Sequence, residues 1–129
     1  MADDLVEHHE HRDAVLLCEV EGLEGADVVV ISYGITSRVA ERAIGMAKEK
    51  GVKVGSFRLI TAWPFPEKQI IELSKKVKAF VFPELNLGQM VLEVERLAAG
   101  RTKTIPVSHV GGTVHSPEAI FNKIMEAAR

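Results

Sequence analysis

The sequence predicts a three-layer α/β fold, in which a mostly parallel sheet of about five strands is covered by helices on both faces. Short runs rich in valine and isoleucine recur along the chain, and each is followed by a stretch whose apolar residues return at helical spacing. Strands that alternate with helices at intervals of roughly 25 residues imply right-handed crossovers and parallel pairing. These two observations define the fold class before any motif is considered.

Four apolar segments are predicted to be strands. One of them, VVVIS at 28–32, is apolar almost throughout, which is typical of a strand buried on both faces of a parallel sheet. An earlier apolar segment, AVLLCEV at 14–20, is either a fifth strand or part of a connection. The other predicted strands lie at 52–57, 79–82 and 105–110.

The first two predicted helices follow the strands at 28–32 and 52–57. Ser37 is expected to cap the first helix and Gly51 to end it in a left-handed conformation. Pro66 fits the first turn of the second helix, with Glu67 beside it favoured by the helix dipole. The residues expected on the buried faces of these helices are Val39, Ala43, Met46 and Ala47, and then Ile70, Leu73 and Val77.

Two further helices complete the pattern. One is expected to run from about Leu87 to a stop at Gly100. The other has Ser116 as its cap and Pro117 at its first helical position. The residues expected on their buried faces are Met90, Val91, Val94, Leu97 and Ala98, and then Ile120, Ile124 and Ala127 or Ala128.

Composition limits the classes of partner. A chain of 129 residues is the size of one domain, expected at 14–129, and 1–13 is interpreted as a flexible tail or a linker remnant. A net charge of -2 gives no reason to expect nucleic acid or an acidic membrane surface. The acidic start and the lack of a long apolar stretch argue against a signal peptide or membrane span, so a cytoplasmic location is expected.

The cysteine and histidine content provides few candidates for metal or redox chemistry. Cys18 is the single cysteine, which excludes an internal disulfide and a cysteine-held iron–sulfur cluster, and it is interpreted as a small buried thiol. His8, His9 and His11 have spacing that can scavenge a metal, but a solvated tail explains them more simply. His115 on a glycine-rich loop is either an acid–base group or a solvated side chain.

Open α/β sheets bind ligands beyond the carboxyl ends of their strands, which here lead into the segments 32–37, 58–66, 83–89 and 111–116. In SYGITS (32–37), helix amides beside two hydroxyl residues offer a seat for a phosphate or carboxylate, although an ordinary turn with a cap explains the same residues. Both interpretations remain open from the sequence.

The octapeptide PELNLGQM at 83–90 has a structural explanation. If Asn86 caps the helix, its side chain accepts from first-turn amides and Gln89 reaches back to the Asn86 amide, as in a capping box. Gly88 allows close approach to that turn, and Glu84 lies near the positive end of the helix. We therefore expect a helix start, with Glu84 in an interdomain contact rather than as a catalytic carboxylate.

The order of four motifs identifies a family resemblance. GADVVVISYGITSRVAERAI, RLITAWPFPEKQI, VFPELNLGQMVLEVERL and VSHVGGTVHSPEAIFNKI closely resemble the carboxy-terminal, transketolase-C-like domain of the alpha subunit of 2-oxoacid:ferredoxin oxidoreductases, over roughly residues 12–129. The most specific pieces are the strand-end YG, the PFP before a helix, and ExNxGQ. They comprise Tyr33, Gly34, Pro64, Phe65, Pro66, Glu84, Asn86, Gly88 and Gln89.

The resemblance implies a larger enzyme that oxidatively decarboxylates a 2-oxoacid to an acyl-CoA and passes the electrons to ferredoxin. Such an enzyme uses thiamine diphosphate with Mg, iron–sulfur clusters and coenzyme A. No catalytic, cofactor-binding or metal residue is assigned to this domain, because its sequence offers no acid suited to activating the thiazolium ring, no GDG-type metal and diphosphate motif and no cysteine cluster, and the pyrimidine-binding domain of a full alpha subunit is expected to lie outside these residues. The implied partners are that domain, the beta subunit and ferredoxin through the holoenzyme, with gamma or delta subunits as further candidates.

The expected role is that of an accessory and assembly domain, inactive in isolation. Its interface candidates are the residues of the three most specific pieces, YG, PFP and ExNxGQ, together with Trp63, because aromatic residues often anchor interfaces. One alternative is a stand-alone module that holds a small anion in the loops at the strand ends. A purely structural dimerisation module is another.

Overall fold

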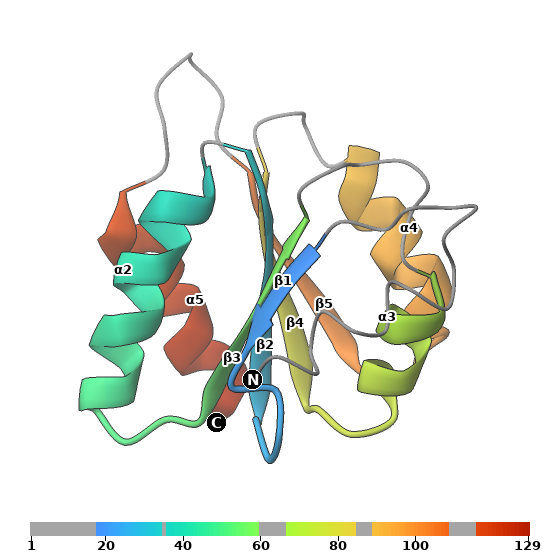
Figure 1. The fold of residues 1–129 in the computed structure, drawn as a ribbon, viewed down its shortest axis with the longest axis horizontal. Helices are drawn as coiled ribbons and strands as arrows, with labels where there is room; N and C mark the ends of the chain where they lie inside the picture. The colour runs from blue at the N-terminus through green and yellow to red at the C-terminus, as the bar shows by residue number, and fades with distance from the viewer. Residues whose placement is uncertain (1–17, 35, 60–66, 85–88, 109–115) are drawn as a thin grey trace.

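The fold is built on a single sheet that lies between two layers of helices (Figure 1). The computed structural model describes residues 18–34, 36–59, 67–84, 89–108 and 116–129. The strands are β1 (Cys18–Glu21), β2 (Val28–Tyr33), β3 (Val54–Leu59), β4 (Ala79–Glu84) and β5 (Lys103–Ser108). The helices are α2 (Thr36–Glu49), α3 (Glu67–Ser74), α4 (Gln89–Ala98) and α5 (Pro117–Ala128).

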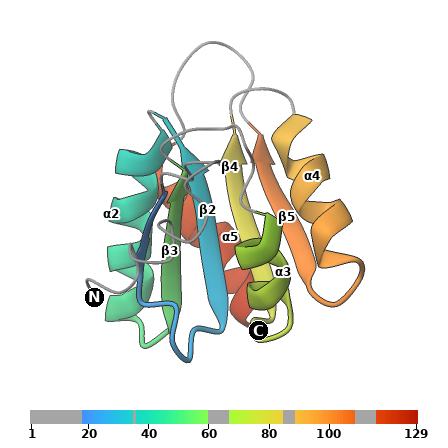
Figure 2. The same ribbon diagram turned by 45° about the vertical axis from the view of Figure 1, so that its right-hand side comes forward.

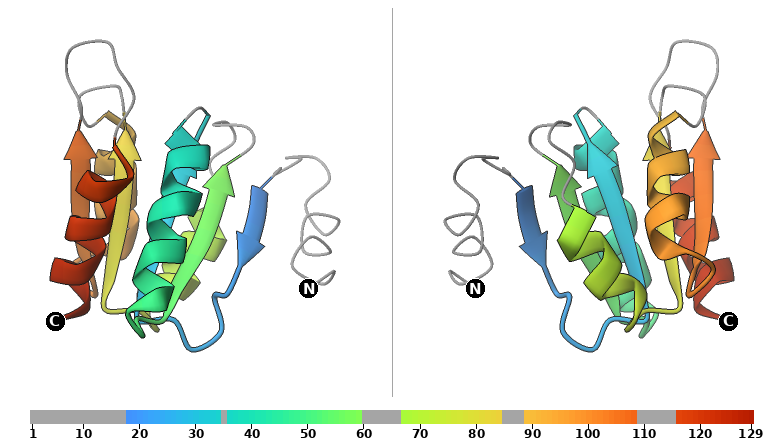
Figure 3. Two further views of the ribbon diagram at one scale, coloured as in Figure 1. Left: turned by 90° about the vertical axis from the view of Figure 1, so that its left-hand side faces the viewer. Right: turned by 90° about the vertical axis from the view of Figure 1, so that its right-hand side faces the viewer.

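The strands are ordered β1-β3-β2-β4-β5, so β2 and β4 are the two central strands of the parallel part of the sheet, β3-β2-β4-β5 (Figure 2). The pairs β2–β3, β2–β4 and β4–β5 are parallel. β1 pairs with β3 in the antiparallel sense, and Figure 3 shows it running against its neighbours. The prediction of a mostly parallel sheet of about five strands is therefore confirmed.

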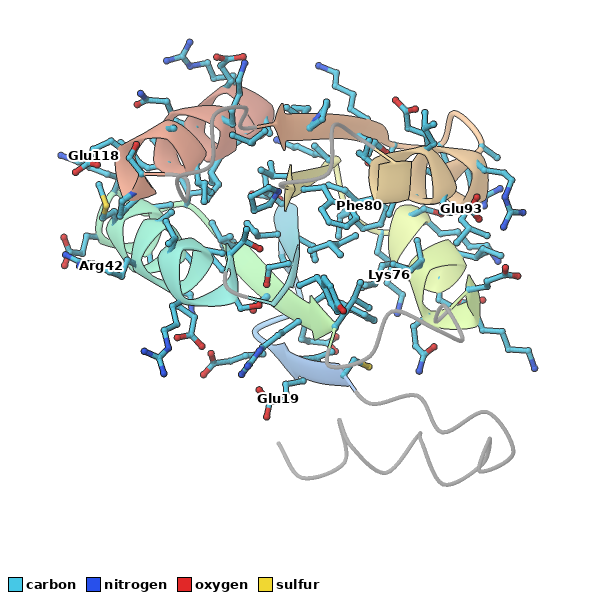
Figure 4. All side chains as sticks on the ribbon, turned by 90° about the horizontal axis from the view of Figure 1, so that it is seen from above. Glu19, Arg42, Lys76, Phe80, Glu93 and Glu118 are labelled. Carbon is cyan, nitrogen blue, oxygen red and sulfur yellow. The ribbon has the colours of Figure 1, made fainter. Side chains whose placement is uncertain are left out.

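The core has one hydrophobic cluster on each face of the sheet. Side chains alternate across a strand, so β2 sends Val29 and Ile31 to the cluster with α3 and α4, and Val28 and Val30 to the cluster with α2 and α5. Seen from above, each pair of helices covers its own face, and Phe80 lies between the sheet and α4 (Figure 4). Complete burial of each such apolar side chain stabilises the fold by about 1.5–3 kcal/mol.

The predicted helix boundaries are confirmed where a local signal is strong. Ser116 is the N-cap of α5 and its hydroxyl accepts a hydrogen bond from Ala119 N at 3.1 Å, with Pro117 in the first turn. Gly51 and Gly100 adopt the left-handed conformation, with φ of 86° and 81°, just after α2 and α4.

The start of α2 corrects two expectations. The helix begins at Thr36, so Ser37 is a helical residue and not the cap; its hydroxyl bonds to Ser32 instead. The buried face is also rotated from the expected one. Val39 and Met46 are only partly buried, and the buried residues include Ala40, Ala43, Ile44 and Ala47.

The limits of several other strands and helices also differ from the predicted ones. The segment predicted at 105–110 begins two residues earlier, because Lys103 and Thr104 pair with Ala79 and Phe80 of β4. α3 ends at Ser74, so Val77 is buried in the turn that follows rather than on the helix. The apolar segment at 14–20 contributes Cys18 to Val20 to β1, and Cys18 is buried as expected.

Candidate functional site

The candidate site is the edge of the sheet where β2, β3, β4 and β5 end, which we call the carboxyl edge. It is defined by the last residues of these strands, Tyr33, Leu59, Glu84 and Ser108. Because parallel strands end at the same edge, the predicted loops at 32–37, 58–66 and 83–89 all leave from it. The fold thus brings the motifs from distant parts of the sequence to one side of the molecule.

The two central strands separate as they approach this edge. β2 and β4 pair at Val28, Val29 and Val30, and no pair follows Val30↔Val81. On their outer sides β2 continues to pair with β3 as far as Tyr33, and β4 with β5 as far as Glu84. After β2 the chain first adds β3 on one side and then, through α3, adds β4 on the other side of β2. The gap between β2 and β4 is therefore the topological switch point, where α/β sheets usually bind ligands.

Apolar side chains fill the region where β2 and β4 part. Ile31 on β2 and Phe82 on β4 are both fully buried, and both belong to the cluster under α3 and α4. The separation therefore reaches the edge of the sheet without exposing the apolar core below it.

The turn between β2 and α2 carries a cluster of buried hydroxyl groups. Ser32 Oγ donates to Ser37 Oγ at 3.1 Å, and Thr36 Oγ1 donates to the carbonyl of Tyr33 at 2.8 Å. Gly34 has φ of 66° and its carbonyl accepts from Ser37 N at 3.0 Å. These hydroxyls, which are 2–3% exposed, bond within the turn, so their geometry favours a structural role over an anion seat.

Tyr33 is a predicted interface residue whose side chain the structure describes, and this side chain is exposed. It ends β2 and is 39% exposed, whereas Val28 to Ile31 on the same strand are fully buried. By the alternation along β2, Tyr33 lies on the face of Val29 and Ile31. Its ring offers a large amphipathic surface at the carboxyl edge, as interface anchors commonly do.

Two further predicted residues are placed by the backbone alone. Glu84 is the last residue of β4 and pairs with Ser108 of β5, and Gln89 is the first residue of α4. Glu84 and Tyr33 therefore end adjacent central strands. The other predicted residues, Trp63, Pro64, Phe65, Pro66, Asn86 and Gly88, lie outside the described residues, as do His8, His9, His11 and His115.

One exposed apolar residue near this edge was not predicted from the sequence. Leu92 lies in the first turns of α4 and is 62% exposed. Its position between the buried residues Val91 and Val94 was the available signal, because a leucine one step off the apolar face of a helix must point outward.

An ion-pair network joins α3 to α4 on the outer surface. Arg96 Nη2 lies 3.0 Å from Glu93 Oε1 and 3.1 Å from Glu67 Oε2. The carboxylate of Glu93, through its hydrogen bond and charge, and then that of Glu67 raise the pKa of the Arg96 guanidinium. All three side chains are exposed, so this network contributes little stability.

Metal-site and membrane features are both lacking in the part of the chain that the structure describes. Its residues contain no group of three or more His, Cys, Asp or Glu side chains placed to hold a metal ion. Within the same residues, no helix has the length and apolar character needed to cross a membrane.

Comparison with known proteins adds an independent line of evidence. Residues 26–120 match the family described as pyruvate:ferredoxin oxidoreductase core domain II. The chain is 40% identical over 115 residues to the 2-oxoglutarate synthase subunit KorA of Methanothermobacter marburgensis, a match that covers 89% of this chain and 31% of that subunit. It is 38% identical over 106 residues to the ketoisovalerate oxidoreductase subunit VorB of the same organism, covering 82% and 30%.

Solved structures agree with the sequence matches. The fold is similar to 2-oxoglutarate:ferredoxin oxidoreductase from Magnetococcus marinus, with a TM-score of 0.75, 29% identity and coverage of 94% of this chain and 21% of that one. A split-gene transketolase, described as an inactive beta4 tetramer, has a TM-score of 0.73 at 16% identity, covering 85% and 42%, which shows a shared fold alone. The chain spans about a third of the length of the curated relatives it matches.

Proposed function

This chain belongs to the pyruvate:ferredoxin oxidoreductase core domain II family, and we propose that it is an accessory and assembly domain of a thiamine-diphosphate-dependent 2-oxoacid:ferredoxin oxidoreductase. The enzyme would decarboxylate a 2-oxoacid oxidatively to an acyl-CoA and pass the electrons to ferredoxin. In this proposal the domain does not catalyse the reaction by itself. It packs against the cofactor-binding domains through its carboxyl edge.

The observation that carries the proposal is the extent of the match to KorA. The similarity runs over most of this chain and yet covers only 31% of the relative. A subunit of that kind needs the rest of its length for further domains, and a domain that serves them must offer a contact surface. The exposed Tyr33, at the end of an otherwise buried central strand, supports the carboxyl edge as that surface.

The cofactors are proposed to be held by the neighbouring domains and subunits. The Magnetococcus marinus enzyme has 2-oxoglutarate, coenzyme A and succinyl-CoA bound. In the described part of this chain, the buried hydroxyls at the β2–α2 turn are used within the turn, and no clustered metal ligands are present. These observations support the proposal that the cofactors are held elsewhere, so no step of the chemistry is assigned to the described residues.

Complementation tests the proposal directly. The Methanothermobacter marburgensis KorA subunit would be prepared without the segment that aligns with this chain and combined with its partner subunits and the 129-residue chain added separately. Reduction of an electron acceptor with 2-oxoglutarate and coenzyme A would then be measured. We expect activity only in the combined sample.

Two controls make the outcome decisive. The chain alone should give no turnover of 2-oxoglutarate, pyruvate or 2-oxoisovalerate, and no heat of binding with thiamine diphosphate in calorimetry. Turnover by the isolated chain would overturn the proposal. So would a stable complex that forms without this chain and is already fully active.

A further inference from the structure

A basic surface lies at the opposite edge of the sheet, where the parallel strands begin. It is formed by two turns, α3–β4 and α4–β5, whose cationic residues we call the lysine patch. Every member has an exposed side chain. The patch consists of Lys75, Lys76, Lys78, Arg101 and Lys103.

The two turns are fastened together, so the patch is presented by a fixed scaffold. Arg101 Nε donates to Ser74 Oγ at 3.1 Å, and Thr102 Oγ1 donates to the carbonyl of Val77 at 2.9 Å. The backbone of Lys103 donates to the carbonyl of Lys78 at 3.4 Å, where β4 and β5 begin to pair. Preorganised cations of this kind bind a partner at a lower entropic cost than cations on a loose segment.

The positive charge of the patch is mostly uncompensated within the described residues. Lys75 Nζ lies 3.4 Å from Glu72 Oε2, an exposed and therefore weak pair. Arg101 bonds to two neutral acceptors, Ser74 Oγ and the carbonyl of Leu97, and so keeps its charge. The helix dipoles of α3 and α4 explain the presence of some of these cationic residues, because cations are stabilised near the negative, carboxyl end of a helix. Lys78 Nζ likewise donates to the carbonyl of Ala128 at the end of α5, at 3.5 Å, whereas Lys103, the first residue of β5, is not explained in that way.

The charge of the rest of the chain identifies the kind of partner. With five cations and Glu72, the patch carries four net positive charges, so the remaining residues of a chain whose total is -2 carry six net negative charges. Four of these six negative charges belong to residues 1–17, so the described residues outside the patch carry two net negative charges and offer a long polyanion such as nucleic acid no further net positive surface, whereas a compact acidic surface needs only the patch. Four lysines out of five cations also suit hydrated carboxylates, since a lysine acts as a compact point charge without the bidentate geometry of arginine.

We infer that the lysine patch is a docking surface for a negatively charged protein surface. This inference does not depend on the proposed function, because the patch lies at the edge opposite to the proposed interface. The contact would be wet and dependent on salt, and its main effect would be to steer and orient the partner.

Binding of a model peptide tests the inference. The full 129-residue chain, labelled with nitrogen-15, would be titrated with a short synthetic peptide of consecutive glutamates, and amide shifts would be followed by NMR at low and high salt. We expect saturable shifts centred on residues 75–78 and 101–103 that disappear at high salt. A glutamine peptide of equal length should cause none.

Matched variants locate the binding. The triple variant Lys76→Gln, Lys78→Gln and Lys103→Gln should weaken glutamate-peptide binding about tenfold, as expected for three exposed ion pairs. The control triple variant Arg38→Gln, Arg42→Gln and Lys68→Gln removes the same charge from exposed positions on α2 and α3 and should bind nearly as well as the original chain.

Three outcomes would overturn the inference. One is the absence of saturable shifts with the glutamate peptide. Another is an equal loss of binding in the two triple variants, which would mean that overall charge governs the interaction. The third is tighter binding of a single-stranded oligodeoxynucleotide at the same residues, which would assign the patch to nucleic acid. Thermal melting of both triple variants would verify that they remain folded.

Discussion

Gly55 is a residue whose identity is imposed by a close approach of two backbones. A Cβ atom at this position would lie 2.9 Å from the carbonyl oxygen of Gly22 and 3.0 Å from Leu23 Cδ2. The segment after β1 therefore passes directly over the start of β3. No local pattern reveals this contact, because Gly22 and Gly55 are far apart in the sequence.

Replacing Gly55 by alanine should destabilise the fold. The added methyl group meets backbone that cannot move without disturbing the β1–β3 pairing, at a cost of about 1–3 kcal/mol in the free energy of unfolding. Chemical denaturation measures this change. Gly45→Ala is the matched control, because Gly45 is exposed within α2 and, apart from its chain neighbours and the nearby backbone of its own helix, no atom lies within 4 Å of its Cβ position. That control should stabilise by about 0.5–1 kcal/mol; equal midpoints for the two variants would contradict the predicted contact.

Substitution of Glu84 distinguishes two roles for this residue, one in an interdomain contact and the other in the chemical reaction. It ends β4 beside the end of β2, and under the proposed function it takes part in an interdomain contact. Glu84→Ala should therefore weaken assembly with the partner subunits about tenfold, through loss of a charge at an interface. Sedimentation of the assembled complex measures assembly, and turnover per assembled complex should stay the same.

Glu49→Ala serves as the control for that experiment, since Glu49 is an exposed glutamate that ends α2 at the opposite edge. It should leave assembly unchanged. A Glu84→Ala complex that assembles normally but has lost its turnover would instead assign this residue to the chemistry.

At the scale of elements, β5 shows how the sheet protects an open edge. β5 is an outer strand with β4 as its neighbour in the sheet. The Lys103 amide donates toward the β4 side. Because the backbone amides of alternate residues point to opposite edges of a strand, the amide at position 106, three residues later, would point away from β4 and out of the sheet. A proline there removes a donor that another strand could use.

Pro106→Val should preserve the fold and increase self-association. Valine favours a strand and restores the outward N–H, which completes a pairing edge for a second copy. Light scattering over a range of protein concentrations would detect the association. Pro117→Ala removes a proline from the start of α5 instead and should leave the particle mass measured by light scattering the same as that of the original chain. Equal association in both variants would argue against a protective role for Pro106.

The helices and strands themselves were largely predictable. The cap at Ser116 and the stops at Gly51 and Gly100 were located correctly because capping and left-handed turns depend on a few adjacent residues. Ser37 was misassigned for the opposite reason. Its hydroxyl bonds to Ser32 on the preceding strand, and that contact exists only once the helix has packed on the sheet.

At the scale of the whole molecule, the candidate site could be predicted only in part. The strand-end motifs correctly indicated a shared carboxyl edge with Tyr33, Gly34 and Glu84, because parallel strands must end together. The separation of β2 from β4 and the burial of the turn hydroxyls were not foreseeable. Both depend on how neighbouring strands and helices meet, and those contacts join distant residues.

The sequence by itself determined the alternation of strands and helices, the buried character of the central strands and the family resemblance. These follow from local periodicity, turn residues and the order of motifs along the chain. Only the tertiary structure decided the strand order β1-β3-β2-β4-β5, the antiparallel pairing of β1 and the two turns that gather the lysine patch. The physical reason is that hydrogen-bond pairing and side-chain burial between distant segments select these arrangements, and no short stretch of sequence contains both partners.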